Sequence, residues 1–147
     1  MILYKFEDYA VSNNLQGKQA PLNLKSNPAG LEFKTVLTET YNKGVNFAGH
    51  YAIAEWGCGT NCTQMAVIDT VSGNVYFFPY ESSMNKEAII GADKIEYRID
   101  SNLLIIHPMN PPDDLIKNCN CWPLDTKYYK WENNKFILIY PKYPQYR

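Results

Sequence analysis

The sequence predicts an α+β fold that is mostly β: an antiparallel sheet of hairpins, a meander of about seven strands, with one packed amphipathic helix. Two observations lead to this prediction. From residue 49 onward, apolar and polar residues alternate in short segments that are separated by Asn, Asp and Gly, which is typical of β-hairpins. Before residue 49, one segment combines helical spacing with the residues that start and stop helices.

The predicted helix spans residues 28–43. Asn27 is a candidate N-cap, Pro28 suits the first helical position, and Gly44 suits the exit. The residues at helical spacing on its packed face are Phe33, Val36, Leu37, Thr40 and Tyr41.

The strands are predicted from period-two patterns. "ILYKF" at the N-terminus reads as a short strand, and "GHYAIAEW" at residues 49–56 reads as a longer one. Three hairpins follow, turning at Ser72–Asn74, at Asp100–Asn102 and at Asn133–Asn134. Asn, Asp and Gly tolerate the positive φ that tight hairpin turns require.

Length and charge narrow the classes of protein. The 147 residues fit one globular domain, 1–147, with one core. A net charge of −1 favours neither nucleic acid nor an anionic membrane as a partner. No apolar run approaches the ~20 residues that span a bilayer. The start, "MILYKFEDYA", lacks the pattern of a signal peptide, so the expected location is cytoplasmic, or periplasmic if a signal peptide was trimmed.

The densest cluster of chemically active residues is "NFAGHYAIAEWGCGTNC", residues 46–62. On a strand, His50 shares a face with Ala52, whereas Glu55 points to the opposite face. This alternation disfavours a local His–Glu pair. A carboxylate from another strand, such as Asp69, could still reach His50. A hydrogen-bonded structural histidine is the preferred interpretation.

The four cysteines form the spacings C-x3-C (Cys58, Cys62) and C-x-C (Cys119, Cys121). Three interpretations stay open. Four thiolates could bind zinc, although a one-residue gap between ligands is awkward. Cys58 could be a nucleophile with His50 as its base. Disulfides or buried structural thiols are the third interpretation and the preferred one, so we expect neither a metal nor another cofactor.

Residues 108–126 form a connection longer than the ~12–15 residues usual for a loop without secondary structure. Its prolines stiffen it, which lowers the entropy lost when it orders against a partner. We expect a docking surface here, with two carboxylates beside apolar anchors. The candidate binding residues are Asp113, Asp114, Leu115, Ile116 and Trp122.

Four segments together carry a resemblance: "FEDYAV", "GVNFAGHYAIAEWGCGTNCTQMAVIDTVSGNVYFFP", "YRIDSNLLII" and "YYKWENNKFILI". They resemble a family of small uncharacterised bacterial proteins whose signature is NFAGHY followed by WGCG-x-x-C and an Asp-to-Gly-Asn hairpin. The likeness runs from about Phe6 to Ile139. The resemblance implies a shared fold and implies no function.

Two classes of function remain. The preferred one is a non-catalytic binding or inhibitory module, most concretely an immunity-type protein that neutralises a toxin by direct binding. The 12 tyrosines and the acidic loop suit a protein partner, for example a basic toxin domain. The alternative is a small periplasmic hydrolase or thiol enzyme that uses His50, Cys58 and a distant carboxylate such as Asp69.

Overall fold

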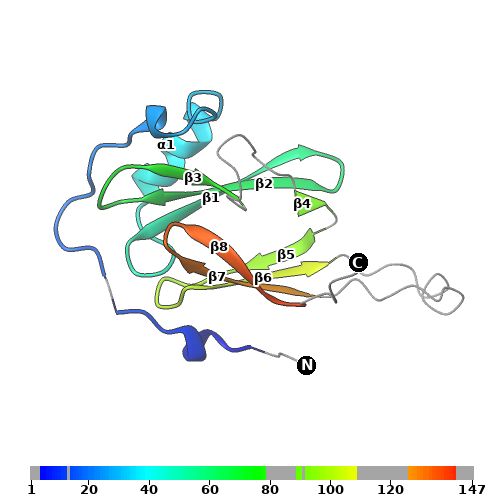
Figure 1. Ribbon diagram of the computed structural model, residues 1–147. Helices are drawn as coiled ribbons and strands as arrows, with labels where there is room; N and C mark the ends of the chain where they lie inside the picture. Colours follow the sequence, from blue (N-terminus) through cyan, green and yellow to red (C-terminus); the bar gives the residue numbers. More distant parts are fainter. Residues whose placement is uncertain (1–3, 13, 79–88, 91, 109–125, 142–147) are drawn as a thin grey trace, which may run out of the picture.

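The computed structural model describes residues 4–12, 14–78, 89–90, 92–108 and 126–141. Its strands form two antiparallel sheets (Figure 1). The first sheet has the order β1–β2–β3, with β4 also pairing with β2; its strands are β1 (Tyr51–Gly59), β2 (Cys62–Asp69), β3 (Val75–Phe77) and β4 (Ile89–Ile90). The second sheet has the order β5–β6–β7–β8; its strands are β5 (Ala92–Glu96), β6 (Leu103–Pro108), β7 (Lys127–Glu132) and β8 (Lys135–Tyr140).

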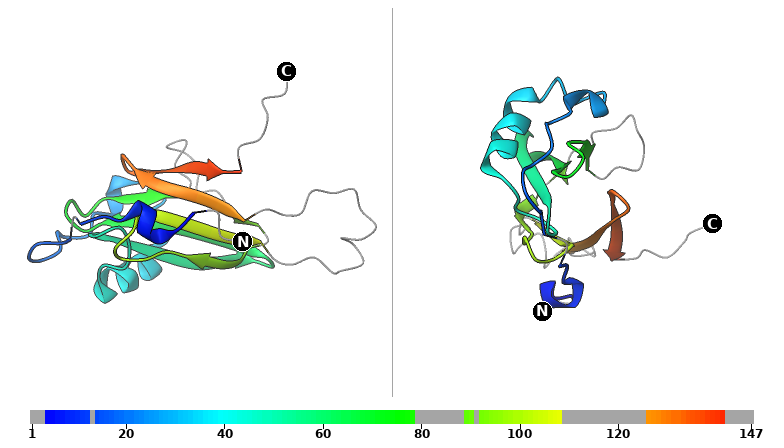
Figure 2. Two further views of the ribbon diagram at one scale, coloured as in Figure 1. Left: turned by 90° about the horizontal axis from the view of Figure 1, so that it is seen from below. Right: turned by 90° about the vertical axis from the view of Figure 1, so that its left-hand side faces the viewer.

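The two sheets face each other across a shared core. Buried Ile53, Met65 and Val67 of the first sheet pack in one cluster with Leu104 and Trp131 of the second. Helix α1 (Lys34–Lys43) covers the outer face of the first sheet, and the N-terminal segment lies on the outer face of the second (Figures 1 and 2). The predicted mostly β fold, with antiparallel hairpins and one packed helix, is therefore confirmed.

The strands are divided between two sheets, whereas the sequence pattern suggested one. Strand β2 shows the physical reason, because Met65, Ala66, Val67 and Ile68 are all buried although successive side chains point to opposite faces. A sheet with two apolar faces needs a cover on each face. The second sheet covers one face, and α1 with its preceding segment covers the other.

The helix is shorter than predicted. It begins at Lys34, and the residues between Asn27 and Phe33 form turns. Asn27 caps one of these turns, since its Oδ1 accepts a hydrogen bond from the Ala29 amide (3.0 Å). The exit is as predicted: Gly44 has a φ of 93°, and its N–H donates to the carbonyls of Thr40 and Tyr41. Leu37 is fully buried on the predicted packed face.

The predicted N-terminal strand is wrong within the described residues. Phe6–Tyr9 form a short 3-10 helix, η1, and a second one, η2, spans Leu24–Ser26. The Tyr4 ring contacts the rings of Tyr9, Tyr128 and Tyr140. These aromatic residues pack on the outer face of the second sheet, so burial against that face decides the conformation of the segment.

The three predicted hairpins are confirmed. The β2–β3 turn closes at Gly73, which has a φ of 84°. The β7–β8 turn places Asn133 and Asn134 at φ values of 53° and 61°. The loop between β5 and β6 is longer than predicted, from residue 97 to residue 102.

Candidate functional site

The "NFAGHY" motif forms a tight loop that joins the two sheets. The Phe47 amide and the Tyr51 amide each donate to the other residue's carbonyl, which closes the loop through Ala48 (φ 47°) and Gly49 (φ 89°). The amides of Ala48 and Gly49 then donate to carbonyls of the β5–β6 loop, those of Arg98 and Ile99. The motif therefore anchors the start of the first sheet to the second sheet.

His50 is the last residue of this loop and pairs with a carboxylate of the neighbouring strand. Its Nε2 lies 3.6 Å from Oδ1 of Asp69, the carboxylate that the sequence offered as a distant partner. Its ring lies 4.2 Å from the ring of Tyr51, which is directly opposite Asp69 across β1 and β2. The prediction that His50 shares the face of Ala52 is wrong. The His50 side chain lies beside Tyr51 and Asp69, whereas Ala52 packs in the cluster that contains Leu37 of helix α1.

Five side chains form a partly polar group between the sheets, which we call the inter-sheet cluster: His50, Tyr51, Asp69, Tyr76 and Trp131. Burial raises the pKa of the Tyr51 hydroxyl above its ordinary value. The Trp131 indole partly offsets this rise, whereas nearby Asp69 and Tyr76 add to it. The indole Nε1 of Trp131 is buried and has no hydrogen bond of good geometry within the described part of the chain.

The chemistry open to this cluster is limited by its composition. At 3.6 Å the His50–Asp69 contact is longer than a hydrogen bond, and it is an ion pair when His50 is protonated. The five side chains include no serine, threonine or cysteine nucleophile. The arrangement places an imidazole and a carboxylate side by side at the start of the first sheet, next to the ring of Tyr51.

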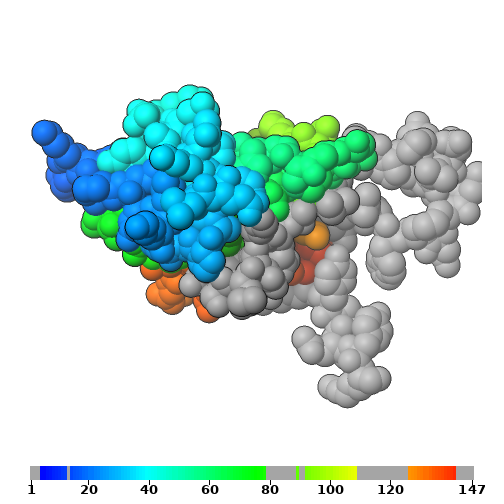
Figure 3. Space-filling model, turned by 90° about the horizontal axis from the view of Figure 1, so that it is seen from above, coloured from blue at the N-terminus to red at the C-terminus, as the bar shows by residue number. Residues whose placement is uncertain are grey.

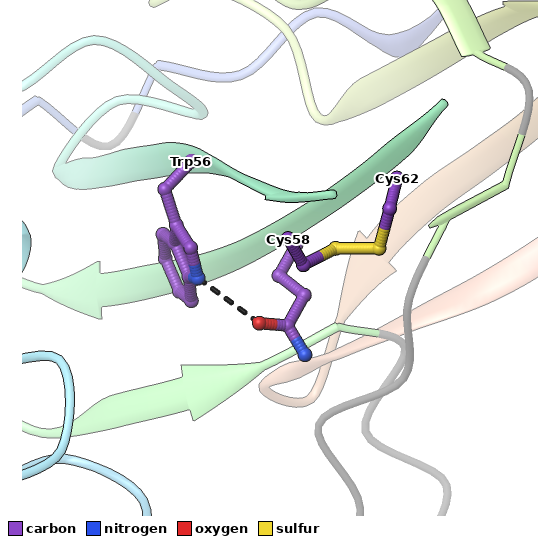
Figure 4. Close-up of a disulfide and its surroundings, with 4 residues drawn as sticks. Trp56, Cys58 and Cys62 are labelled. Atoms are coloured by element: carbon purple, nitrogen blue, oxygen red, sulfur yellow. Dashed lines mark hydrogen bonds between the residues drawn. A yellow bond between two sulfur atoms is a disulfide. The ribbon is translucent and has the colours of Figure 1, made fainter. Parts of the chain in front are cut away.

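Cys58 lies at the other end of β1 and forms a disulfide with Cys62 (Figure 4). It follows His50 by eight positions along an extended chain, which is a span of roughly 26 Å. The catalytic pair of His50 and Cys58 that the sequence suggested is therefore not formed. The physical reason is that a strand is fully extended, so residues close in sequence at its two ends lie far apart in space. The disulfide also withholds both sulfurs from zinc, and Cys119 and Cys121 lie outside the described residues.

The disulfide closes the tip of the β1–β2 hairpin, which we call the hairpin tip (residues 57–62). The strand register shifts between Gly57 and Gly59, so that Gly59 pairs with Cys62. Residues 57–61 are exposed. Below the tip, the Trp56 indole donates to Gln64 Oε1 at 3.0 Å and links the two strands. The glycine-rich exit from the strand is thus a bulged hairpin.

The second histidine, His107, also pairs with a carboxylate across a hairpin. Its Nε2 lies 2.5 Å from Oε2 of Glu96, and Lys94 Nζ lies 3.3 Å from the other oxygen. The hydrogen bond from His107 holds the pKa of Glu96 below its ordinary value, with Lys94 acting in the same direction. This site was not among the residues predicted from the sequence. The signal was present, because a turn at 100–102 places residues 94 and 107 opposite each other.

The predicted binding residues Asp113, Asp114, Leu115, Ile116 and Trp122 lie outside the described residues. The described chain leaves β6 at Pro108 and enters β7 at Lys127.

The ends of β6 and β7 can be placed relative to the hairpin tip. Pro108 pairs with Ala92 at the start of β5, and β4, just before β5 in the chain, pairs with Cys62 and Thr63. Both strand ends therefore lie at the same end of the two-sheet structure as the hairpin tip (Figure 1). We call this the tip end.

Comparisons of the chain with protein-family models, curated proteins and solved structures found no match. The resemblance to the NFAGHY family stays a prediction. Among the described residues, no helix has the length and apolar character needed to cross a membrane.

Proposed function

We propose that this protein is a non-catalytic binding module of the immunity type, which neutralises a toxin by direct binding at the tip end. The observation that carries the proposal is the placement of the hairpin tip. Its exposed residues 57–61 stand beside the strand ends that flank the acidic segment 109–125. Loops held at one end of a rigid two-sheet scaffold are a common basis of recognition.

Two features of the described chain support a scaffold role. Residues of both sheets share one core, which fixes the relative position of the strand ends. The hairpin tip extends past helix α1 at the surface, where the green of the β1–β2 hairpin continues beyond the cyan helix (Figure 3). The disulfide restrains this exposed tip, and a restrained segment loses less entropy on binding.

The proposed partner is a basic toxin domain. Asp113 and Asp114 bring negative charge to the flanked segment, and Leu115, Ile116 and Trp122 bring apolar anchors. Opposite charges across an interface accelerate association, while buried aromatic and aliphatic anchors slow dissociation.

The experiment compares two double variants in association with a protein captured from the native host. The captured protein must itself be toxic, and the chain must suppress that toxicity. Replacing Asp113 and Asp114 by Lys should slow association at low salt by about tenfold or more. The control makes the same change in charge at exposed positions away from the tip end, with Glu39→Lys and Asp100→Lys. Equal association rates for both double variants would contradict the proposal.

A second candidate function is a small hydrolase, and the contact between His50 and Asp69 favours it. In that case His50 would act as the general base with Asp69 orienting it. The two candidates differ in their response to His50→Gln. The enzyme would lose turnover of a hydrolysable ester, whereas the binding module would keep its toxin affinity.

We further propose an oxidising compartment, such as the periplasm, for the mature chain. The disulfide between Cys58 and Cys62 supports this location, because such bonds persist outside the reducing cytoplasm. Alkylation of intact cells followed by mass mapping tests it. Free Cys58 and Cys62 thiols in the living cell would count against this location.

A further inference from the structure

We propose that the Cys58–Cys62 disulfide is a site of thiol–disulfide exchange, which accepts two electrons from a dithiol while the fold stays intact. This inference is independent of the proposed binding function. It rests on the exposure of the bond and on the hydrogen-bonded hairpin around it.

The first observation is accessibility. Cys58 is exposed, Cys62 is half-buried, and the three residues between them are all exposed. A disulfide reacts when a thiolate can approach one of its sulfurs along the bond axis, so an exposed bond is more labile than one in a core. The adjoining Gly57 and Gly59 carry no side chains that could shield Cys58.

The second observation is that hydrogen bonds, in addition to the disulfide, join the two strands of the hairpin. Backbone pairing continues on both sides of Cys58: Gly57 pairs with Thr63, and Gly59 pairs with Cys62. The Trp56–Gln64 hydrogen bond lies next along the hairpin. The disulfide closes a ring with a sequence separation of only 4, and a short ring restricts the unfolded chain little. Reduction therefore leaves the register of β1 and β2 in place.

The two sulfurs are not equivalent. Cys58 lies at the bulge and is the more exposed, whereas Cys62 pairs with β4 and is half-buried. A thiolate of the dithiol attacks Sγ of Cys58, a mixed disulfide forms, and Cys62 leaves as the thiolate. The second thiol of the dithiol, as its thiolate, then attacks the first sulfur of the dithiol, which is bonded to Cys58 Sγ. This attack closes the disulfide of the dithiol and releases Cys58 as a thiolate. The dithiol ends as a disulfide, and the two cysteine thiolates take up protons from solvent according to pH.

The test uses dithiothreitol as the probe on the folded chain without denaturant. Alkylation and peptide mapping report Cys58 and Cys62 separately from Cys119 and Cys121. We expect millimolar dithiothreitol to reduce the Cys58–Cys62 bond while the circular dichroism spectrum keeps its native form. The expected fall in Tm is about 8 °C or less. Reduction that occurs only in denaturant, or that abolishes the native spectrum, would overturn the proposal.

Two single variants test the direction of attack. Cys62→Ser leaves Cys58 as a free thiol, and Cys58→Ser leaves Cys62. We expect the thiol of Cys62→Ser to react severalfold faster with an aromatic disulfide reagent than the thiol of Cys58→Ser, in the folded state at one pH. Equal rates would refute the assignment of Cys58 as the attacked sulfur. Should either variant fail to fold, the wild-type chain decides the matter through the site of its trapped mixed disulfide.

Discussion

The side chain of Asn46 hydrogen-bonds to both backbone polar groups of Ile53. Its Nδ2 donates to the Ile53 carbonyl at 3.1 Å, and its Oδ1 accepts from the Ile53 amide at 2.7 Å. Strand β1 is an edge of the first sheet, so Asn46 takes the place of a further strand at this point. An edge strand whose polar groups are occupied is less prone to pair with another chain.

The first prediction concerns this contact. Replacing Asn46 by Ala removes two hydrogen bonds, so we expect the free energy of unfolding to fall by about 1–3 kcal/mol. Asn46→Asp keeps an acceptor for the Ile53 amide but loses the donor, so an intermediate loss is expected. Urea denaturation measures both. The control is Asn14→Ala at an exposed position, where a change within about 0.5 kcal/mol is expected. A loss for Asn46→Ala no larger than the control would refute the edge-covering role.

The second prediction concerns Gly73 in the β2–β3 turn. Its φ is 84°, and a Cβ at this position would meet the Pro21 carbonyl oxygen at 2.0 Å. Both the backbone conformation and the close approach therefore require glycine. We expect Gly73→Ala to lower the free energy of unfolding by at least about 2 kcal/mol.

Gly57→Ala is the matched control for Gly73→Ala. A Cβ at Gly57 would meet nothing within 4 Å, and this residue has no positive φ. Its expected change is within about 0.5 kcal/mol. Thermal unfolding of both variants is the measurement, and similar Tm values for the two would contradict the steric argument.

The third prediction concerns the pH dependence of Glu96. Its pKa is below the ordinary 4.5, first because His107 hydrogen-bonds to the carboxylate. A depressed pKa in the folded state means that the contribution to stability is present above about pH 4.5 and is lost as pH falls through the folded pKa. We expect Glu96→Gln to reduce stability at pH 7, and this difference from wild type to shrink on acidification.

An NMR titration of the Glu96 carboxyl carbon checks this directly. The midpoint should lie below 4.5 in the wild type and rise towards that value in His107→Ala. A wild-type midpoint at or above 4.5 would show that the carboxylate gains nothing from its neighbours.

The fourth prediction concerns Tyr97, whose hydroxyl donates to Glu55 Oε2 at 2.6 Å and so links the β5–β6 loop to β1. Burial raises the pKa of Tyr97 above its ordinary value of 10.0, and the hydrogen bond and charge of Glu55 raise it further. A raised pKa means that the stabilising contribution is present below pH 10 and is lost as pH rises through the folded pKa.

The measurement is the difference in phenolate absorbance between wild type and Tyr97→Phe during alkaline titration. We expect a midpoint above 10. Glu55→Gln should lower that midpoint and still leave it above 10, because burial is the larger cause. If Glu55→Gln had no effect, the hydrogen bond between Tyr97 and Glu55 would not form in solution.

The sequence by itself determined several turns of this protein and the end of its helix. Asn133 and Asn134 lie at positive φ in a turn that their residue types predicted, and Gly44 ends the helix where its position predicted. Asp69 was also identified as an available partner for His50. The turn and the helix end depend on backbone conformations that few residue types adopt, so a short stretch of sequence is enough to predict them.

Only the tertiary structure decided how these elements meet. The division into two sheets follows from the buried apolar residues on both faces of β2, because each face needs its own cover. The pattern within one hairpin does not tell which elements provide that cover. The helix begins at Lys34 and not at residue 28, and Phe6 belongs to a 3-10 helix and not to a strand. In both places packing against a sheet overrides local preference. The contact of His107 with Glu96 and the separation of His50 from Cys58 depend on strand register and strand length. These distances depend on how strands pair and on how far an extended chain reaches. Residue type alone does not predict them.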